Sequence, residues 1–574
     1  MNQPKQYMGL LLILSLLSVN VKSQAIDLNN LKAITKAKSI KLNGGVSANA
    51  IYANGTLGAG RAPFSYFLQG NVNVNLFGQL NLPFSFNLTN GGTKYNYPTL
   101  PNRLSLHPNY KWLSGHVGDV AMTFSPYTLN GHQFTGVGVE ATPEGPFKFS
   151  IMYGRLQKAV SYDSTNSNGV PAYKRMGYGS KVSFERSKYK LGLSFFTAKD
   201  VLNSIDSKAD SFQVFPQQNV AINGEAAFRP IKGLDITFEY AVSALTRDIR
   251  DSTKALAKNA LLNKMLSQNG STGYYNALKA GLNYTFRQST LGLGYERIDP
   301  GYQTLGAYYF NNDLENITAN FAQSLFANKA NIAASVGYQR DDLDNAKAGS
   351  TSRTVGSINF NYTPNAKLQL SSGYSNFQTF MNMRSQFDYI NQNTPIQNFD
   401  TLDYTQLSQN ANLTINYALL QTEKQQHSLS INTSFQDAYD EQGGKVVKGN
   451  ESQFYNLATA YTIIFLQKGI GVTTAYNASY NTIGRNDFLT MGPTIGVNAK
   501  LLQKRVSTSL SGSYNFSNAQ GEQNTSVWNV RMNASYTVLK KHSLNCSVIN
   551  QWRKQVGKSN TKYLTGTIGY NYSF

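Results

Sequence analysis

Apolar and polar residues alternate with a period of two along most of the chain beyond residue 40. One clear example runs through Leu80, Leu82, Phe84, Phe86 and Leu88, which are separated by polar or small residues. The same alternation recurs at 234–242, 280–286 and 413–417. Because successive side chains of a strand point to opposite faces, this pattern predicts strands with one apolar and one polar face.

The length of the alternating runs indicates strands that cross a membrane. Many runs reach about ten residues, whereas strands of soluble sandwiches average about five or six. A tilted strand needs about that greater length to cross a bilayer. An open sheet in lipid would leave the hydrogen-bonding groups of its edges without partners, so the sheet must close. The sequence therefore predicts an all-β protein, a large closed transmembrane antiparallel β-barrel. Aromatic residues near strand ends would form its interfacial girdles: Tyr153, Tyr189, Tyr295, Tyr362, Tyr514 and Tyr536.

The spacing of turns predicts the number of strands. Candidate short turns lie at 77–79, 143–146, 185–188, 230–233, 287–289, 327–329, 363–367, 421–426, 466–469, 501–505 and 538–543. Longer polar stretches lie between them, at 158–173, 200–218, 245–274, 299–313, 341–353, 381–404 and 437–452. We expect short and long connections to alternate from 143 to the C-terminus. Because residues 91–131 hold either two strands or none, the barrel has roughly 24 to 26 strands.

The start of the chain predicts export. Lys5 precedes the apolar run "MGLLLILSLLSV", and the small residues Val21 and Ser23 follow it. This order is typical of a secretory signal peptide at 1–23, which is cleaved. A short periplasmic segment, 24–39, would then precede the barrel at 40–574. That segment is too short for the plug domain of a TonB-dependent transporter, so we expect neither a plug nor a periplasmic domain.

The excess of basic residues changes this picture only slightly. The net charge is +21, but an exported barrel does not favour nucleic acid as the partner. A basic lumen would favour anionic solutes. Basic residues also recur in the short turns, where they would face the periplasm: Lys232, Lys329, Lys367, Lys468, Lys504, Arg505, Lys540 and Lys541. The single cysteine, Cys546, excludes an intrachain disulfide and lies in phase with the apolar face of its strand.

The last residues carry a resemblance to a known class. Leu564, Ile568, Tyr570, Tyr572 and Phe574 alternate with polar or small residues and end the chain on an aromatic side chain. This stripe resembles the C-terminal signal of Gram-negative outer-membrane barrels, which the barrel-assembly machinery reads. The resemblance implies a bacterial outer-membrane location with a periplasmic C-terminus. It also implies outer-membrane lipid, lipopolysaccharide and the assembly machinery as partners.

An aromatic loop at 299–316 adds a second resemblance. It is similar to a stretch in large uncharacterised barrels from bacteria with type 9 secretion. Its aromatic side chains could stack on a glycan or close the pore, although a loop of this kind also packs on itself. The candidate contact residues are Tyr302, Tyr308, Tyr309 and Phe310.

The stretch 245–274 predicts a helix within an external loop. Leu256, Leu261 and Met265 recur at helical spacing before a stop at Gly270. Such a helix could fold into the lumen, contact a partner, or pack only on neighbouring loops.

Weaker motifs concern modification and metals. The tripeptides "DST" at 163–165 and 251–253 and "DTL" at 400–402 resemble the short O-glycosylation motif of the same bacteria. They make Ser164, Ser252 and Thr401 candidate acceptors. The run "DDLDN" at 341–345 carries oxygen ligands that calcium prefers, and His107, His116 and His132 cluster in the chain. Neither has the spacing of a known metal site, so we expect a solvated loop and neutral histidines.

Two functions remain after the search for chemistry. No Ser/His/Asp motif, phosphate loop or HExxH motif is present, so we expect no enzyme, cofactor or metal. Long loops and basic turns favour a non-catalytic subunit of a larger outer-membrane complex, such as the barrel-assembly or type 9 secretion machinery. Its partners would be other outer-membrane proteins or lipoproteins. The alternative is a porin-like channel or transporter for small solutes, because so wide a barrel cannot fill its interior with wall side chains.

Overall fold

The computed structural model describes most of the chain beyond residue 39. The described residues are 40–55, 63–90, 103–162, 171–205, 214–254, 265–308, 311–345, 352–376, 381–382, 403–404, 409–438, 441–442, 445–446 and 451–574. The signal peptide at 1–23 and the segment 24–39 lie outside this part. The prediction that no plug or periplasmic domain precedes the barrel therefore stays a prediction.

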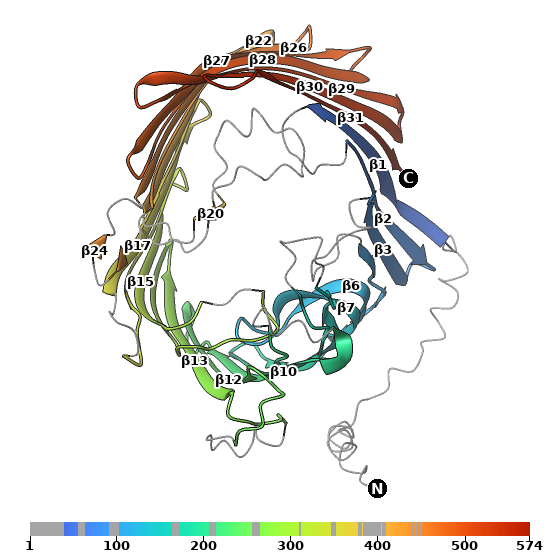
Figure 1. Cartoon of the computed structure of the whole chain (residues 1–574), viewed down its shortest axis with the longest axis vertical. Coiled ribbons are helices and arrows are strands. Elements are labelled where there is room, and N and C mark those ends of the chain that lie inside the picture. Colours follow the sequence, from blue (N-terminus) through green and yellow to red (C-terminus); the bar gives the residue numbers. More distant parts are fainter. Residues whose placement is uncertain are drawn as a thin grey trace.

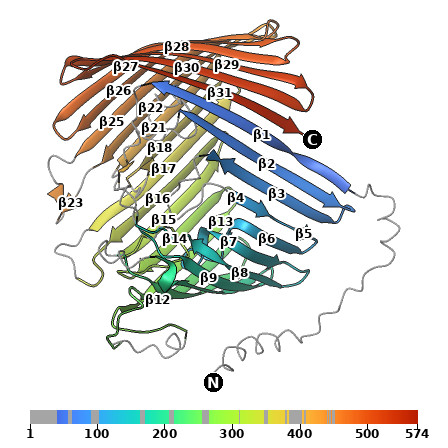
Figure 2. The same cartoon turned by 45° about the vertical axis from the view of Figure 1, so that its right-hand side comes forward.

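Within the described residues, 27 strands form one antiparallel sheet that closes on itself. The first strand, β1 (Ile40–Gly55), pairs with β2 (Phe64–Leu76) on one side and with β31 (Thr561–Ser573) on the other (Figures 1 and 2). Two short strands, β4 (Arg103–Leu106) and β5 (Asn109–Tyr110), lie end to end between the same neighbours. They fill one position, so the ring has 26 positions. The predicted closed antiparallel barrel is confirmed, at its upper strand number.

The other barrel strands follow in chain order around the ring. They are β3 (Leu80–Thr89), β6 (Leu113–Thr123), β7 (Asn130–Ala141), β8 (Phe147–Gln157), β9 (Arg175–Glu185), β10 (Tyr189–Asp200), β11 (Gln218–Phe228), β12 (Leu234–Thr246), β13 (Thr272–Phe286), β14 (Ser289–Ile298), β15 (Leu314–Leu325), β16 (Ala330–Arg340), β17 (Ser352–Asn365), β18 (Leu368–Ser375), β21 (Gln409–Gln421), β22 (Gln425–Ala438), β25 (Ser452–Phe465), β26 (Ile470–Ile483), β27 (Asn486–Leu501), β28 (Val506–Ala519), β29 (Glu522–Leu539) and β30 (His542–Gln555).

Small elements complete the described part. Two isolated hairpins pair β19 (Met381–Asn382) with β20 (Asp403–Tyr404), and β23 (Glu441–Gln442) with β24 (Lys445–Val446). A short 3₁₀ turn, η4, spans Leu202–Ser204. No helix among the described residues is long and apolar enough to cross a membrane.

The short turns lie where the alternation predicts them. Each predicted short turn joins two neighbouring strands at one end of the barrel, and a further one at 111–112 joins β5 to β6. The expected alternation of short and long connections is wrong for the last part of the chain. At the opposite end, β26–β27 and β28–β29 are joined by only two residues each, and β30–β31 by five. Direct hairpins suffice there because these strands are long and pair along their whole length.

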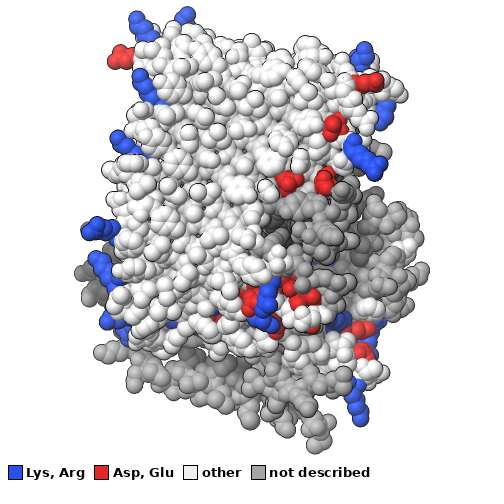
Figure 3. Space-filling view, turned by 90° about the vertical axis from the view of Figure 1, so that its left-hand side faces the viewer, with Lys and Arg blue, Asp and Glu red and all other residues white. Residues whose placement is uncertain are grey.

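The outer face of the wall is apolar. Exposed side chains at alternate strand positions include Phe84, Phe238, Leu293 and Ile568, whose side chain is 65% exposed. Figure 3 shows a broad uncharged band on the outside, with charged residues confined to its two rims. The predicted phase of the strands is therefore confirmed at these positions.

Backbone pairing holds the two ends of the barrel together. The Phe574 N–H donates to the Gly44 carbonyl at 3.0 Å, and the Gly44 N–H donates to the Phe574 carbonyl at 3.3 Å. The Tyr572 and Phe574 rings lie next to each other, with centroids 5.4 Å apart. The aromatic C-terminus therefore completes the closing strand instead of extending from it as a free tail.

Candidate functional site in the barrel lumen

Two loops that are far apart in the sequence form a structured layer on the inner wall. We call residues 124–129, between β6 and β7, and 299–308, between β14 and β15, the inner shelf. Phe124, Leu129 and Leu305 pack with wall residues Phe196 and Leu245 in one buried cluster. Tyr127 and Tyr302 pack with Ala241, Ala277 and Ile298 in a second. The shelf thus covers the inner face of β6–β14 on one side of the ring (Figure 1).

Direct hydrogen bonds join the two loops. The Tyr302 hydroxyl donates to the Tyr127 carbonyl at 2.8 Å, and the Thr304 hydroxyl donates to the Thr128 carbonyl at 2.7 Å. The Asn130 N–H donates to the Gly306 carbonyl at 2.9 Å. Burial, reinforced by nearby carboxylates, raises the pKa of both the Tyr127 and Tyr302 phenols, so they stay neutral donors.

Asn219 fixes the shelf to the wall. Its side chain is fully buried, and its amide donates to the Ser243 hydroxyl at 2.8 Å and to the Ala244 carbonyl at 3.0 Å. Its side-chain oxygen accepts from the Leu305 N–H at 3.1 Å. One residue therefore ties β11, β12 and the loop 299–308 together.

A band of ion pairs lies on the same inner wall. We call it the luminal charge band; its members are Lys148, Lys181, Glu185, Lys190, Glu225, Glu239, Lys279 and Glu296. Lys181 lies 2.9 Å from the Glu225 carboxylate and donates to the Phe124 carbonyl at 2.6 Å. The Tyr127 hydroxyl donates to Glu296 at 2.6 Å. These contacts join the band to the inner shelf, and its four cations balance its four carboxylates.

The rest of the inner wall is lined by amides and hydroxyls. We call the inner faces of β15–β31 and β1–β3 the amide–hydroxyl wall. Cross-strand partners on it include Asn412 and Ser434, Asn456 and Ser479, and Ser513 and Asn529. Several bond to each other: the Asn533 amide donates to the Ser509 hydroxyl at 3.1 Å, and the Ser547 hydroxyl donates to Asn533 at 2.7 Å. Apart from Glu522 at the first position of β29, no carboxylate among the described residues faces inward from these strands, whereas Arg531 and Arg553 do.

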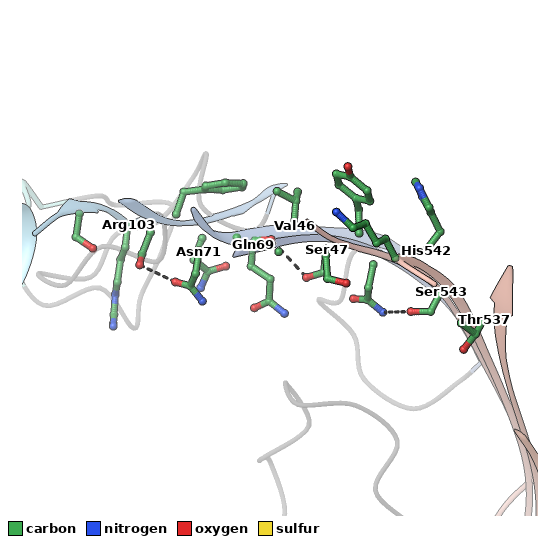
Figure 4. Close-up of a pocket in the computed structure, with 18 of the residues that line it drawn as sticks. Val46, Ser47, Gln69, Asn71, Arg103, Thr537, His542 and Ser543 are labelled. Carbon is green, nitrogen blue, oxygen red and sulfur yellow. Dashed lines mark hydrogen bonds between the residues drawn. The ribbon is translucent and has the colours of Figure 1, made fainter. Parts of the chain in front are cut away.

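A hollow of about 800 Å³ lies where the barrel closes. In Figure 4, Ser47, Gln69, Asn71 and Arg103 project to one side of the wall, while Val46 projects to the other. The Ser85 hydroxyl donates to the Asn71 side-chain oxygen at 2.6 Å. The polar lining thus continues across the closing seam.

The residues of the aromatic loop at 299–316 differ in how deeply they are buried. Tyr302 is fully buried in the shelf, whereas the Tyr308 side chain is 56% exposed. Tyr308 stacks on the His132 ring at 4.1 Å, and its hydroxyl accepts from the Gln133 N–H at 3.1 Å. Tyr309 and Phe310 lie outside the described residues. The loop therefore packs on the wall and on residues 124–129, which the sequence analysis did not single out, although "FSPYTL" is unusually aromatic and apolar for a strand connection.

The predicted helical loop lies against the outer wall where the structure describes it. Leu266 is buried against Val220 and Ala244, which share the outward phase of Tyr240. Neighbouring Met265 is exposed. Leu256 and Leu261 lie outside the described residues, and the flanking residues 251–254 and 265–271 are not helical. This placement argues against a lumen contact for Met265, while a partner contact and packing on neighbouring loops both stay predictions.

The remaining predicted sites are placed as follows. Ser252 is exposed in the loop between β12 and β13, while Ser164 and Thr401 lie outside the described residues. Glycosylation stays a prediction at all three. Leu564, Ile568, Tyr570 and Tyr572 lie on the outward phase of β31, and recognition of this stripe by the assembly machinery also stays a prediction.

The fold brings two of the three clustered histidines together. His107 Nδ1 and His116 Nδ1 are 2.9 Å apart, and His116 Nε2 lies 3.1 Å from Glu140. Glu140 thus bonds the far nitrogen of His116, so the three groups form a chain and do not surround one point. Among the described residues, no group of three or more His, Cys, Asp or Glu side chains could hold a metal ion.

The comparisons with known proteins give distant similarities only. No protein-family model matches the chain, and no curated protein matches it. Among solved structures, it is similar to the FrpB iron transporter from Neisseria meningitidis, with 11% identity, 93% of this chain and 82% of that chain covered, and a TM-score of 0.39. The ferric yersiniabactin receptor FyuA from Yersinia pestis gives 10% identity, 93% and 80% coverage, and a TM-score of 0.38. The translocation pore of the P pilus usher PapC gives 10% identity, with 93% of this chain and 99% of that chain covered and a TM-score of 0.35. Likeness of this degree carries no information on function.

Proposed function

We propose that this chain is an outer-membrane β-barrel that conducts polar solutes, uncharged or anionic, through its lumen. The uncharged outer band and the closed hydrogen-bonding of the wall support a membrane location, because lipid tolerates only a barrel without free edges. Twenty-six strand positions enclose a space too wide for the wall's own side chains to fill.

The amide–hydroxyl wall is the observation that best supports a polar solute, uncharged or anionic. Amides and hydroxyls both donate and accept hydrogen bonds, so they can replace the water around a polyhydroxylated solute without favouring either charge. Within its strands, this wall presents arginine side chains to the lumen, as at Arg531 and Arg553. Because the luminal charge band is balanced, we expect these arginines to favour anions over cations.

The test is the ion selectivity of the purified barrel in planar bilayers under a salt gradient. We expect a reversal potential that shows anion preference, and uptake of a neutral disaccharide in liposome swelling. Arg531→Gln combined with Arg553→Gln should reduce the anion preference. Lys558→Gln, in the external β30–β31 connection, is the matched control and should leave it unchanged. Cation preference, or a barrel that passes neither ions nor sugar, would contradict the proposal.

The alternative expectation, a non-catalytic subunit of a larger outer-membrane complex, rests on the sequence analysis. Purification from native membranes in mild detergent tests it directly. Stable co-purification of large partner proteins would support that reading, whereas a barrel that purifies alone and conducts would support the channel.

A further inference from the structure

Cationic side chains gather at the turn end of the barrel, where the strands are joined by short connections. These connections contain fourteen basic residues and two acidic ones, Glu144 and Glu423. We call the basic set the turn ring; its members are Lys111, Arg186, Lys188, Arg229, Lys232, Arg287, Lys329, Lys367, Lys424, Lys468, Lys504, Arg505, Lys540 and Lys541. In Figure 3, Lys and Arg dominate one rim of the uncharged band, whereas Asp and Glu are mixed with them at the other.

In the part of the chain that the structure describes, most of these cations have no anionic partner. Arg229 pairs with Asp235, but no other member of the turn ring has a carboxylate within 4.0 Å among the described residues. All fourteen side chains are exposed. Unpaired cations this close together repel each other, and an external anion would relieve that repulsion.

The same turns expose large apolar side chains. Phe77, Trp112, Ile231, Phe326 and Leu502 are exposed by 48%, 46%, 60%, 70% and 68% of their surface. Apolar groups next to cations are typical of a surface that lies in the headgroup layer of a membrane, where one kind contacts acyl chains and the other contacts phosphates.

The position of the turn ring along the barrel axis agrees with a location in the headgroup layer. Aromatic pairs lie on the outward face a few residues further along the strands, as for Tyr284 with Phe286 at 5.7 Å and Phe360 with Tyr362 at 6.1 Å. Such aromatic girdles mark the boundary between hydrocarbon and headgroups. Cations at 287, 329 and 367, just beyond them, therefore lie at the height of lipid phosphates.

The distribution around the barrel identifies the partner. Turn-ring residues occur from the β5–β6 turn, at Lys111, round to the β29–β30 turn, at Lys541. A docked protein would contact one sector, whereas lipid surrounds the whole wall. We propose that the turn ring binds the anionic phospholipid headgroups of the leaflet on the turn side, the periplasmic leaflet in barrels of this kind. This binding does not depend on conduction through the lumen.

Lipid retention measures the proposed binding. The full-length mature barrel is reconstituted in vesicles of equimolar phosphatidylglycerol and phosphatidylcholine, extracted in mild detergent, and its bound lipid is quantified by mass spectrometry. We expect phosphatidylglycerol to be enriched several-fold over the bulk ratio, and the enrichment to fall in high salt because these contacts are exposed. The ring variant carries Gln at six positions: Lys329, Lys367, Lys468, Lys504, Lys540 and Lys541. It should return the ratio close to that of the bulk.

A charge-matched control separates the ring from net charge. Its six substitutions neutralise as many cations at the opposite end and should leave the enrichment unchanged: Lys199→Gln, Lys254→Gln, Arg485→Gln, Lys554→Gln, Lys558→Gln and Lys562→Gln. Equal heat-modified mobility of all three proteins checks that each is folded. No enrichment in the native sequence, or equal enrichment in the ring variant, would overturn the proposal. Loss of an acidic partner protein from native membranes, with an unchanged lipid ratio, would identify the ring as a protein-binding surface instead.

Discussion

At the scale of single residues, each strand position faces either the outside of the barrel or its lumen. Ile568 and Thr567 are neighbours near the middle of β31, and they face opposite sides of the wall. Ile568→Arg places a charge against hydrocarbon and should cost about 2–4 kcal/mol of unfolding free energy near the bilayer midplane. Thr567→Arg faces the polar interior and should cost far less. Urea unfolding in lipid vesicles measures both variants, and equal costs would mean that the assignment of faces is wrong.

The face of the wall on which each side chain lies could be predicted from the sequence, whereas the contacts between residues inside the barrel could not. Alternation is local, so Phe84 and Ile568 are assigned to the outer face by their immediate neighbours in the chain. Tyr302 and Tyr127 meet across 175 residues, and nothing near either residue indicates the other. The buried position of Asn219 is equally hidden, because an asparagine on an inward strand face is as typical of a solvated lumen as of a hydrogen-bonded anchor.

At the scale of elements, the barrel depends on the pairing of β1 with β31, its most distant strands in the chain. Gly44 sits where β1, β2 and the C-terminus meet, and a Cβ built on it would lie 2.1 Å from the Asn71 carbonyl oxygen. Gly44→Ala should therefore lower the yield of folded, heat-modifiable barrel, because backbone on β2 must move to make room. Gly566→Ala, on β31, meets no atom within 4 Å and serves as the control. Equal yields from the two variants would show that the closing pair tolerates a shift of β2.

Elements at the two ends of the barrel differ in how well their sequence identifies them. Short turns lie between two alternating runs and mostly contain Gly, Lys or Asn, so all except the one at 111–112 could be predicted within a few residues. The connections at the opposite end vary in length from two residues between β28 and β29 to 25 between β12 and β13 and 33 between β18 and β21, and the conformation of the described loops depends on what they pack against. The loop at 265–271 illustrates this, since its buried apolar residue, Leu266, packs on Val220 of β11 and Ala244 of β12.

At the scale of the whole molecule, the interior is asymmetric. The inner shelf and the luminal charge band occupy the side formed by β6–β14, and the amide–hydroxyl wall occupies the rest of the ring. A solute would therefore pass between a structured, charged side and a neutral, polar side. A shelf anchored by buried side chains and hydrogen bonds is a fixed restriction of the path and does not move as a lid would.

Loosening the shelf should widen that path. Tyr302→Ala removes a fully buried ring and its hydrogen bond to residues 124–129, a change that costs about 3–5 kcal/mol for large aromatic side chains. The barrel itself should stay folded, because its wall is held by the strand pairs. The lost stability should therefore loosen the inner shelf. We expect a larger single-channel conductance with more open-channel noise in planar bilayers. Tyr308→Ala is the matched control from the same loop, because Tyr308 is exposed and lies at the edge of β7, where it contacts His132 and Gln133. An identical conductance for both variants and the unmodified protein would place the shelf outside the ion path, and the restriction would then have to be sought along the amide–hydroxyl wall.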